Sequence, residues 1–281
     1  LVNKDVKAMT AATSEMALSE QEFKLYQALF AQKLGIHLPD QKITLVGTRL
    51  WKRLRACGIS SYTSYFQLIN QPEQEAELCR ALELITTNET YFFREPRHFD
   101  YLREHVLPAL KLQDCVRIWS AACSSGEELY SIAMVLADLR SGRWELLGSD
   151  INQSMIEKAR RAIYVDQRTD QIPADYRRRF CRRGIGPHEG SLRIDSDLRS
   201  RVRLRRIELH YTLPDIGMFD VVFLRNVMIY FDNETRKQVV QRIVEHLNPG
   251  GHLFVGHSES LRGISPRLKQ LLPAIYRVEA G

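Results

Sequence analysis

Residues 116–133 constrain the fold of this chain more than any other part of the sequence. They begin with VRIWS, an apolar run typical of a buried strand, continue through a turn containing Gly126, and end in EELYSIA at the start of a helix. A second apolar run, residues 144–149, is followed by Asp150. Strand, tight turn, helix and a later acid together outline a site for a nucleotide-type cofactor. The turn has one glycine where a dinucleotide fingerprint has three, so the pattern alone leaves the cofactor open.

Strands and helices alternate from Cys115 onward. We expect strands at 116–120, 145–149, 219–225 and 252–256, and helices at 127–140, 154–162 and 232–247. This alternation implies parallel strand pairing, and therefore a doubly wound α/β fold with a mostly parallel sheet. Residues 248–251 (NPGG) predict a turn, and residues 274–278 predict an edge strand.

Residues 180–207 interrupt the alternation. Turns containing Gly184, Gly186 and Gly190 lie beside short alternating runs at 191–194 and 201–205. This pattern predicts a small antiparallel β-subdomain near 178–207, inserted in the α/β domain.

The first part of the chain predicts helices only. Ser19 and Glu22 match a capping box, and apolar residues then recur at helical spacing up to Gly35. Further helices are expected at about 40–57, 63–69 and 73–85. We therefore expect an N-terminal all-helical domain at 1–86, with residues 1–14 disordered, and a second domain at 87–281.

Composition narrows the class of protein. Among the 281 residues, no apolar run approaches the roughly 18–20 residues of a membrane helix, and the first residues are polar. The five cysteines have no metal-ligand spacing. We expect a cytoplasmic monomer with reduced thiols, no metal and no membrane insertion. The net charge of +6 favours an acidic partner.

Two glutamates at the expected helix start bear on the cofactor. Glu127 and Glu128 would repel a pyrophosphate, which a dinucleotide site places at that helix end. They suit a cofactor that carries an ammonium and a sulfonium, such as S-adenosylmethionine (AdoMet). The alternative is that both acids only compensate the helix dipole.

Four segments carry a resemblance to a known family. They are residues 86–99 (TTNETYFFREPRHF), 119–133 (WSAACSSGEELYSIA), 224–231 (LRNVMIYF) and 256–259 (GHSE). All four resemble the chemotaxis receptor methyltransferases, the CheR family, and the likeness runs in the same order from about residue 15 to 279.

The resemblance implies a class I AdoMet methyltransferase with an N-terminal helical domain and a small β-subdomain. Such enzymes methylate the side-chain carboxylates of chemoreceptor glutamates. Carried over by motif, Arg94 and Tyr230 are the catalytic residues. The residues that would bind the cofactor are Asn88, Thr90, Arg94, Glu128, Asp150, Glu208, Leu209, Arg225 and Asn226. Enteric family members have Asn-Leu against the adenine where this chain has Glu208-Leu209, which puts a role of the Glu208 side chain in doubt.

The resemblance also implies two partner surfaces. Arg49, Lys52, Arg53 and Arg55 on one helix would steer the acidic methylation helices of a receptor, although a solvated basic face is the alternative. The loop with Gly184, Gly186 and Gly190 would dock a receptor C-terminal peptide as an added strand.

The chemistry fits the residue types. A glutamate carboxylate is ionised near neutral pH, so methyl transfer to it needs orientation rather than a general base. Arg94 is the expected carboxylate clamp. The alternatives are ion pairing of Arg94 with Glu89 or Glu95, structural ion pairing of Arg225, and core packing of Tyr230. His257 is expected to be packed or hydrogen-bonded rather than catalytic.

Two other functions compete with this one. A nucleic-acid methyltransferase would suit the positive charge, but the Asn/Asp-Pro-Pro-aromatic run of amino-methylating enzymes is absent, so no nucleic-acid partner is expected. A non-catalytic adaptor is disfavoured by the presence of Arg94, Asp150 and Tyr230.

Overall fold

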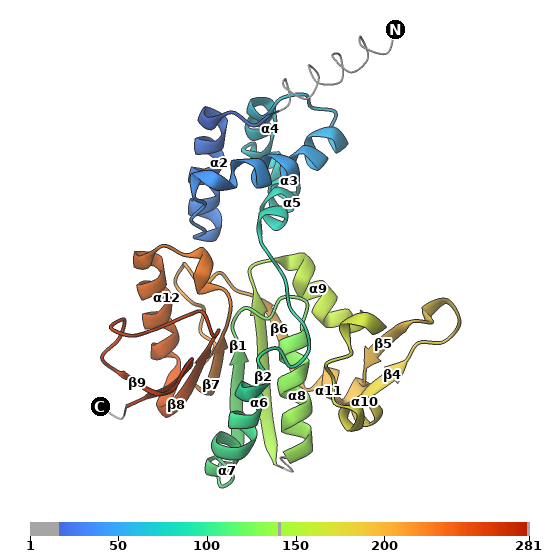
Figure 1. Cartoon of the computed structure of the whole chain (residues 1–281), viewed down its shortest axis with the longest axis vertical. Helices are drawn as coiled ribbons and strands as arrows, with labels where there is room; N and C mark the ends of the chain where they lie inside the picture. Colours follow the sequence, from blue (N-terminus) through green and yellow to red (C-terminus); the bar gives the residue numbers. More distant parts are fainter. Residues whose placement is uncertain (1–16, 140–141, 280–281) are drawn as a thin grey trace. The chain divides into compact units, whose positions relative to one another are not determined.

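The computed structural model describes residues 17–139 and 142–279 (Figure 1). The expected disorder of residues 1–14 lies outside the described residues. The chain divides into two compact units, Leu1–Thr87 and Asn88–Gly281. No helix in the described part of the chain is long and apolar enough to cross a membrane.

The first unit is helical. The capping box at its start is present, with Ser19 accepting from the amide of Glu22. Large side chains such as Tyr26, Phe30 and Tyr65 are fully buried between the helices. The elements are α2 (Glu20–Leu34), η1 (Asp40–Lys42), α3 (Ile43–Ala56), α4 (Tyr62–Ile69), η2 (Pro72–Gln74) and α5 (Glu75–Ile85).

The second unit contains a mostly parallel sheet of seven strands, ordered β6-β2-β1-β7-β8-β10-β9. The predicted α/β fold is thus confirmed. The strands are β1 (Cys115–Ser120), β2 (Arg143–Asp150), β6 (Val202–Arg206), β7 (Phe219–Leu224), β8 (Leu247–Val255), β9 (Leu268–Leu272) and β10 (Ile275–Val278).

Helices cover both faces of this sheet (Figure 1). Adjacent residues of β1 face opposite sides, because Ile118 packs in one core cluster and Trp119 in the other. The first cluster includes apolar residues of α8, the second those of α12. The helices of this unit are α6 (Pro96–Tyr101), η3 (Leu102–Val106), α7 (Leu107–Ala109), α8 (Glu127–Leu139), α9 (Gln153–Arg161), α10 (Ala174–Phe180), α11 (Ser196–Ser200), η6 (Met228–Tyr230) and α12 (Asn233–Glu245).

A separate three-stranded antiparallel sheet, ordered β3-β5-β4, forms the expected small β-subdomain. Its strands are β3 (Ile163–Val165), β4 (Cys181–Arg183) and β5 (Ser191–Ile194), with η4 (Asp166–Arg168) after β3 and η5 (Gly186–His188) in the β4–β5 hairpin. The sheet therefore begins earlier than the predicted 178–207, because the three-residue β3 is too short to leave a sequence pattern.

Contrary to the prediction, the run at 201–205 does not belong to this small sheet. It forms β6, which pairs parallel with β2 at the edge of the main sheet. Val202 and Leu204 are half-buried, whereas Arg203 and Arg205 are exposed. An edge strand with one solvent-exposed face therefore has the same alternation of apolar and polar residues as a hairpin strand.

Two further predictions need correction near the C-terminus. Ile275–Val278 (β10) is not an edge strand, since it lies between β8 and the edge strand β9. The NPGG segment at 248–251 is not a turn before a strand but part of β8, where Gly250 has φ 78° and the register with β7 shifts. The glycines absorb this irregularity without ending the strand.

Candidate active site

From β1 the chain continues to β2 and β6 on one side of the sheet, and then crosses to β7 and β8 on the other side of β1. At such a switch point between β1 and β7, the carboxyl ends of the strands form a crevice that can bind a ligand. β1 ends at Ser120, the neighbouring β2 ends at Asp150, and Arg225 directly follows β7. All three residues are buried. Three polar groups distant in sequence therefore meet at one edge of the sheet.

The turn after β1 is held tightly against its surroundings. Gly126 has φ 97°, and a Cβ atom at this position would lie 2.9 Å from the Cβ of Ala159 in α9. The amide of Cys123 donates to the carbonyl of Ser149 at 2.8 Å. Burial raises the pKa of the Cys123 thiol, which fits a small packed residue rather than a nucleophile. The single glycine is thus required by close packing of the turn on α9.

Asp150 orders the same turn. Its Oδ2 accepts from the amide of Ser124 at 2.9 Å, and its Oδ1 accepts from the amide of Asn152 at 2.9 Å. Burial raises its pKa, while these backbone hydrogen bonds oppose the rise. Each carboxylate oxygen retains a further lone pair that a hydroxyl group can use.

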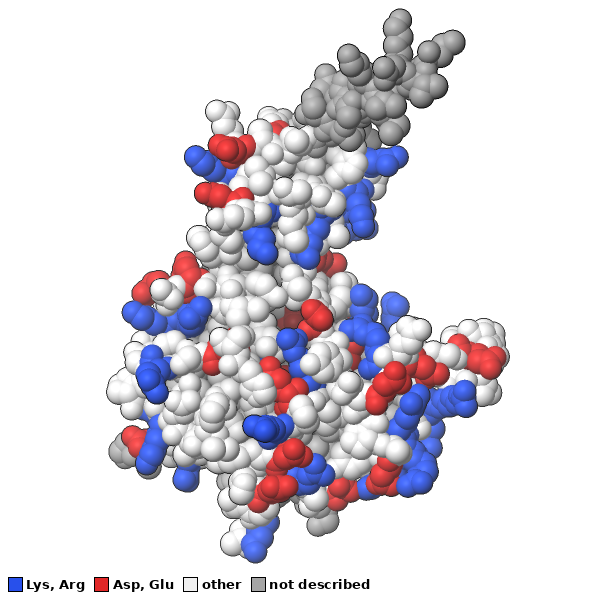
Figure 2. Space-filling model, viewed as in Figure 1, with Lys and Arg blue, Asp and Glu red and all other residues white. Residues whose placement is uncertain are grey.

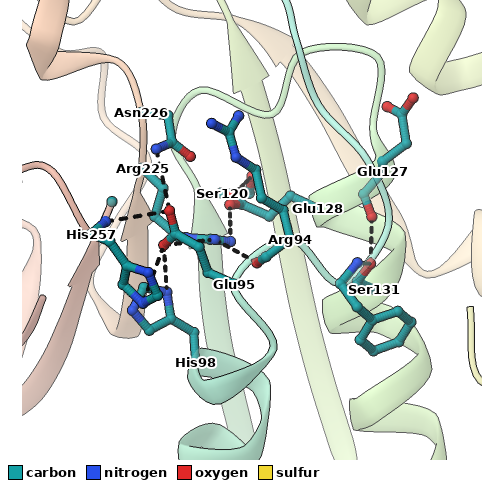
Figure 3. A network of polar contacts seen from close by, with 12 residues as sticks. Arg94, Glu95, His98, Ser120, Glu127, Glu128, Ser131, Arg225, Asn226 and His257 are labelled. Carbon is teal, nitrogen blue, oxygen red and sulfur yellow. Dashed lines mark hydrogen bonds and ion pairs between the residues drawn. The ribbon is translucent and has the colours of Figure 1, made fainter. Parts of the chain in front are cut away.

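Glu127 and Glu128 have different partners, and their side chains point in different directions (Figure 3). Glu127 accepts from Ser125 Oγ at 2.7 Å, and its other oxygen lies 3.1 Å from Arg168 Nη2. Burial raises the pKa of Glu127. Glu128 accepts from Ser120 Oγ at 2.7 Å and from Arg225 Nη1 at 2.9 Å. Glu128 alone therefore belongs to the polar network at the strand ends.

Arg225 connects the strand ends to the segment that carries Arg94 (Figure 3). Its side chain is 1% exposed. Besides Glu128, it contacts Glu95, with 3.0 Å between Arg225 Nη2 and Glu95 Oε2, and it donates to the carbonyl of Arg94 at 2.5 Å. Although burial opposes ionisation, the Arg225 charge holds the pKa of Glu95 below its ordinary value. The alternative of a structural ion pair therefore describes the contacts of Arg225 well.

The Arg94 side chain has a different environment. Its guanidinium donates to the carbonyl of Glu89 at 2.8 Å and lies 5.6 Å from the ring centre of Tyr91. No carboxylate pairs with it among the residues that the structure describes, so the alternative of an ion pair with Glu89 or Glu95 is not found. The guanidinium is held near the site and its charge is not neutralised.

Asn88 and Thr90 join the site through their backbones. The carbonyl of Asn88 accepts from Ser124 Oγ at 3.2 Å, and that of Thr90 accepts from Arg168 at 2.8 Å. Segment 88–94 is thus hydrogen-bonded both to the turn after β1 and to η4, which follows β3 of the β-subdomain.

The remaining predicted residues lie on two loops. Asn226, with φ 57°, directs its side-chain amide to Glu95 Oε1 at 3.4 Å. Tyr230 ends η6 and is half-buried. Glu208 pairs with Arg206 at 2.9 Å, and Leu209 packs in the second core cluster. These contacts bring Asn226 to the network, but not Glu208 or Leu209, and Tyr230 is placed only by its position at the end of η6.

Two acids organise the site in ways that the sequence did not predict. Glu259 accepts from the amides of Asn226, Met228 and Gly256 at 2.7–2.8 Å, and so fixes the loop after β7. Glu95 lies between Arg225 and the imidazole of His98. The position of both acids within the family-like segments was a signal, but their partners are distant in sequence and only the fold identifies them.

The expected basic face on α3 is partly occupied by contacts within the helical unit. Arg49 donates to the carbonyls of Leu84 and Ile85 at 3.1 and 3.0 Å. Arg53 forms two hydrogen bonds, of 2.8 and 2.7 Å, with the buried Glu77. Only Lys52 and Arg55 of the four predicted residues are exposed. Two of the four predicted residues, Arg49 and Arg53, therefore stabilise the helical unit.

The β4–β5 hairpin has the predicted glycine loop. A Cβ atom at Gly184 would lie 1.9 Å from the carbonyl oxygen of His188, so a larger residue cannot fit there. Gly186 and Gly190 have φ values of 56° and 75°. Figure 2 shows basic and acidic side chains side by side around this hairpin.

Comparison with known proteins places these features in a family. Residues 21–86 match the model "CheR methyltransferase, all-alpha domain", and residues 88–275 match "CheR methyltransferase, SAM binding domain". The chain is 40% identical to the chemotaxis protein methyltransferase of Escherichia coli over 94% of this chain and 93% of that protein. It is 40% identical to the chemotaxis protein methyltransferase of Salmonella typhimurium over 90% of this chain and 88% of that protein. It is 35% identical to chemotaxis protein methyltransferase 2 of Pseudomonas aeruginosa over 93% of this chain and 94% of that protein. The cofactor of this chain is accordingly AdoMet, and the chain belongs to the CheR family of chemotaxis methyltransferases.

Proposed function

We propose that this protein transfers the methyl group of AdoMet to glutamate side chains of chemoreceptors and forms methyl esters, acting in the cytoplasm as a monomer. The observation that carries this proposal is the state of Arg94. Its guanidinium has no carboxylate partner among the described residues, while the nearby acids Glu95 and Glu128 both contact Arg225. A guanidinium without a carboxylate partner, beside a cofactor site, suits an incoming carboxylate, which it can hold through two hydrogen bonds.

The chain itself has to supply little acid–base chemistry. AdoMet brings a methyl group already activated on a sulfonium. A glutamate with an ordinary pKa of about 4.3 arrives ionised, so no proton has to be removed. The protein's task is to hold the carboxylate in line, and orientation of this kind contributes about 7–11 kcal/mol at most. Arg94 would orient the carboxylate, and Tyr230 would line the path of the methyl group.

The residues at the strand ends fit the cofactor by their charge. We assign Asp150 to the ribose hydroxyls and Glu128 to the methionine or adenosine end of AdoMet. Asn88, Thr90, Arg225 and Asn226 would line the same crevice. Leu209 would meet the adenine, with Glu208 contributing only its backbone, because its carboxylate pairs with Arg206.

The proposal is tested by locating the transferred methyl group. The protein is incubated with isotopically labelled AdoMet and a receptor cytoplasmic fragment, and the digested fragment is analysed by mass spectrometry. We expect label on glutamate side chains, and loss of label at a position when that glutamate is changed to alanine. Label on lysine, arginine or nucleic acid, or no label in the receptor, would contradict the proposal.

We further propose that β4 docks a receptor C-terminal peptide. This strand is at the edge of its sheet, so its outer backbone groups can pair with an added strand. A titration with receptor tail peptides should show saturable binding that a scrambled peptide of equal composition does not show. Absence of binding at millimolar peptide would remove this proposal and leave the methyl-transfer proposal unaffected.

A further inference from the structure

Three possible metal ligands converge beside Arg225 (Figure 3). They are the carboxylate of Glu95 and the imidazoles of His98 and His257. His98 Nδ1 lies 3.4 Å from Glu95 Oε2, and His257 Nε2 lies 3.9 Å from the same oxygen. One ligand atom from each residue lies within 4.8 Å of the other two. Two of the residues come from the start of α6 and the third from the loop after β8.

Two of these groups lack the hydrogen bonds that their burial demands. The His98 side chain is 1% exposed, and neither ring nitrogen has a hydrogen-bond partner among the residues that the structure describes. Glu95 Oε2 lies in an ion pair 3.0 Å from Arg225 Nη2, but it accepts no well-aligned hydrogen bond from the described residues, because the terminal nitrogens of Arg225 donate to Glu128 and to the carbonyl of Arg94. Buried polar atoms without partners are rare in folded proteins, and a bound ion or water commonly satisfies such atoms.

The spacing of the donors fits a tetrahedral ion. Zinc ligands lie about 2.0–2.1 Å from the metal, so two ligands at a tetrahedral angle lie about 3.3 Å apart. The observed separations of 3.4 and 3.9 Å are within reach of a small side-chain movement. The His257 side chain is 52% exposed, which provides both an entry path and the freedom to move.

The surroundings also suit a metal ligand set. The other oxygen of Glu95, Oε1, is fixed by the amide of His257 at 3.3 Å and by Asn226 Nδ2 at 3.4 Å. Such outer contacts orient a metal-binding carboxylate. The second oxygen, Oε2, would exchange its ion pair with Arg225 for the metal ion. Arg225 shares its charge between two carboxylates, Glu95 and Glu128, so Glu128 still compensates it when Glu95 binds an ion.

We propose that Glu95, His98 and His257 bind one zinc-class divalent ion, and that the bound ion slows methyl transfer. Two imidazoles and one carboxylate suit Zn²⁺ rather than Mg²⁺ or Ca²⁺, which prefer oxygen ligands. The ion would draw Glu95 away from Arg225. Since Arg225 also holds the Arg94 carbonyl and Glu128, this shift would disturb the segment that carries Arg94. The spacing of the five cysteines predicted no metal, but the ligands proposed here are two histidines and a glutamate.

Direct zinc binding by the full-length protein tests this site. Zinc is titrated against a chromophoric chelator in the wild type, His257→Ala, Glu95→Gln and His105→Ala, in the presence of excess Mg²⁺. His257 and His105 both have exposed side chains, so neither substitution opens the core, and His105 lies outside the cluster. We expect wild type and His105→Ala to bind one zinc ion that the other two variants bind more than about 100-fold more weakly, since loss of even an outer contact costs about 10–100-fold.

Cobalt(II) identifies the ligands independently of any methylation assay. We expect visible d–d bands in the wild type that disappear in His257→Ala, without a thiolate charge-transfer band. Zinc should also slow receptor methylation by the wild type but not by His257→Ala. Equal zinc binding by all four proteins, or a cobalt spectrum that His257→Ala leaves unchanged, would overturn the proposal and indicate that only water occupies this cluster. Neither result depends on the proposed methyl acceptor.

Discussion

Arg225 is the residue on which the polar contacts of the site converge. It is buried, and it touches the carboxylates of both Glu95 and Glu128. Removing one partner of a buried ion pair costs about 3–5 kcal/mol, because the other charge stays buried without compensation. Arg225 therefore holds the strand ends and the Arg94 segment in one arrangement, and the Arg94 guanidinium has no carboxylate partner among the described residues. This division assigns positioning to one arginine and substrate contact to the other.

Arg94→Lys tests that division at the residue scale. A lysine keeps the positive charge but lacks the planar fork that holds a carboxylate through two hydrogen bonds. Loss of one charge-assisted hydrogen bond, at about 1.5–3 kcal/mol, predicts a fall of roughly 10–100-fold in kcat/KM for the receptor. Arg97→Lys, at an exposed neighbouring position, should retain wild-type kinetics. Wild-type kcat/KM for Arg94→Lys would show that Arg94 does not hold the substrate.

Elements with a strong local pattern could be predicted from the sequence. Residues 116–133 predicted β1, its turn and the start of α8, because the apolar strand, the glycine and the helix start are all encoded locally. β3 was not predicted because three residues are too few to show an alternation of apolar and polar side chains. β6 was assigned to the wrong sheet because an exposed edge strand has the same alternation as a hairpin strand. The division between Glu127 and Glu128 also depended on distant partners, Arg168 and Arg225, which no local pattern encodes.

The contact between α3 and α5 yields a stability prediction at the element scale. Arg53 and Tyr65 hydrogen bonds lower the pKa of Glu77 to about 2, although burial alone would raise it. Because the folded pKa is depressed, this stabilisation is complete above the unfolded pKa of about 4.3 and is lost as the pH falls toward 2. Arg53→Met should therefore lower the free energy of unfolding at pH 7 by about 3 kcal/mol, and by less at pH 3.

Urea unfolding of the full-length protein at pH 7 and at pH 3, followed through the helical signal in circular dichroism, measures this difference. Lys52→Met is the matched control, since Lys52 is exposed and lies next to Arg53 on α3, and its substitution should change the free energy by less than about 0.5 kcal/mol. An Arg53→Met penalty equal at pH 7 and pH 3 would show that Glu77 does not carry the effect.

The charge of the whole molecule concerns how it meets its substrate. With a net charge of +6, the protein should associate faster with an acidic receptor surface, and salt should reduce that advantage. The full set of four basic residues on α3 is a poor test of steering, because Arg49 and Arg53 support the helical unit. Lys52 and Arg55 are the exposed members that remain available for a partner.

Reversal of these two charges tests steering. Lys52→Glu combined with Arg55→Glu should lower kcat/KM for receptor methylation several-fold at low salt, without changing AdoMet affinity. The control is Lys237→Glu combined with Arg262→Glu, which changes the net charge by the same amount at exposed positions of the second unit. This control should retain wild-type kcat/KM. If both double variants lose activity to the same extent, net charge rather than the α3 surface is responsible.

If the methyl acceptor is a carboxylate, the product is an ester, and its stability in base distinguishes it from a methylated nitrogen. Receptor protein labelled by this enzyme with radioactive methyl from AdoMet is treated with mild alkali, and volatile radioactivity is collected. A methyl ester hydrolyses under these conditions, so the account predicts release of the label as methanol. Label that stays on the protein after alkali would indicate methylated nitrogen and contradict the account.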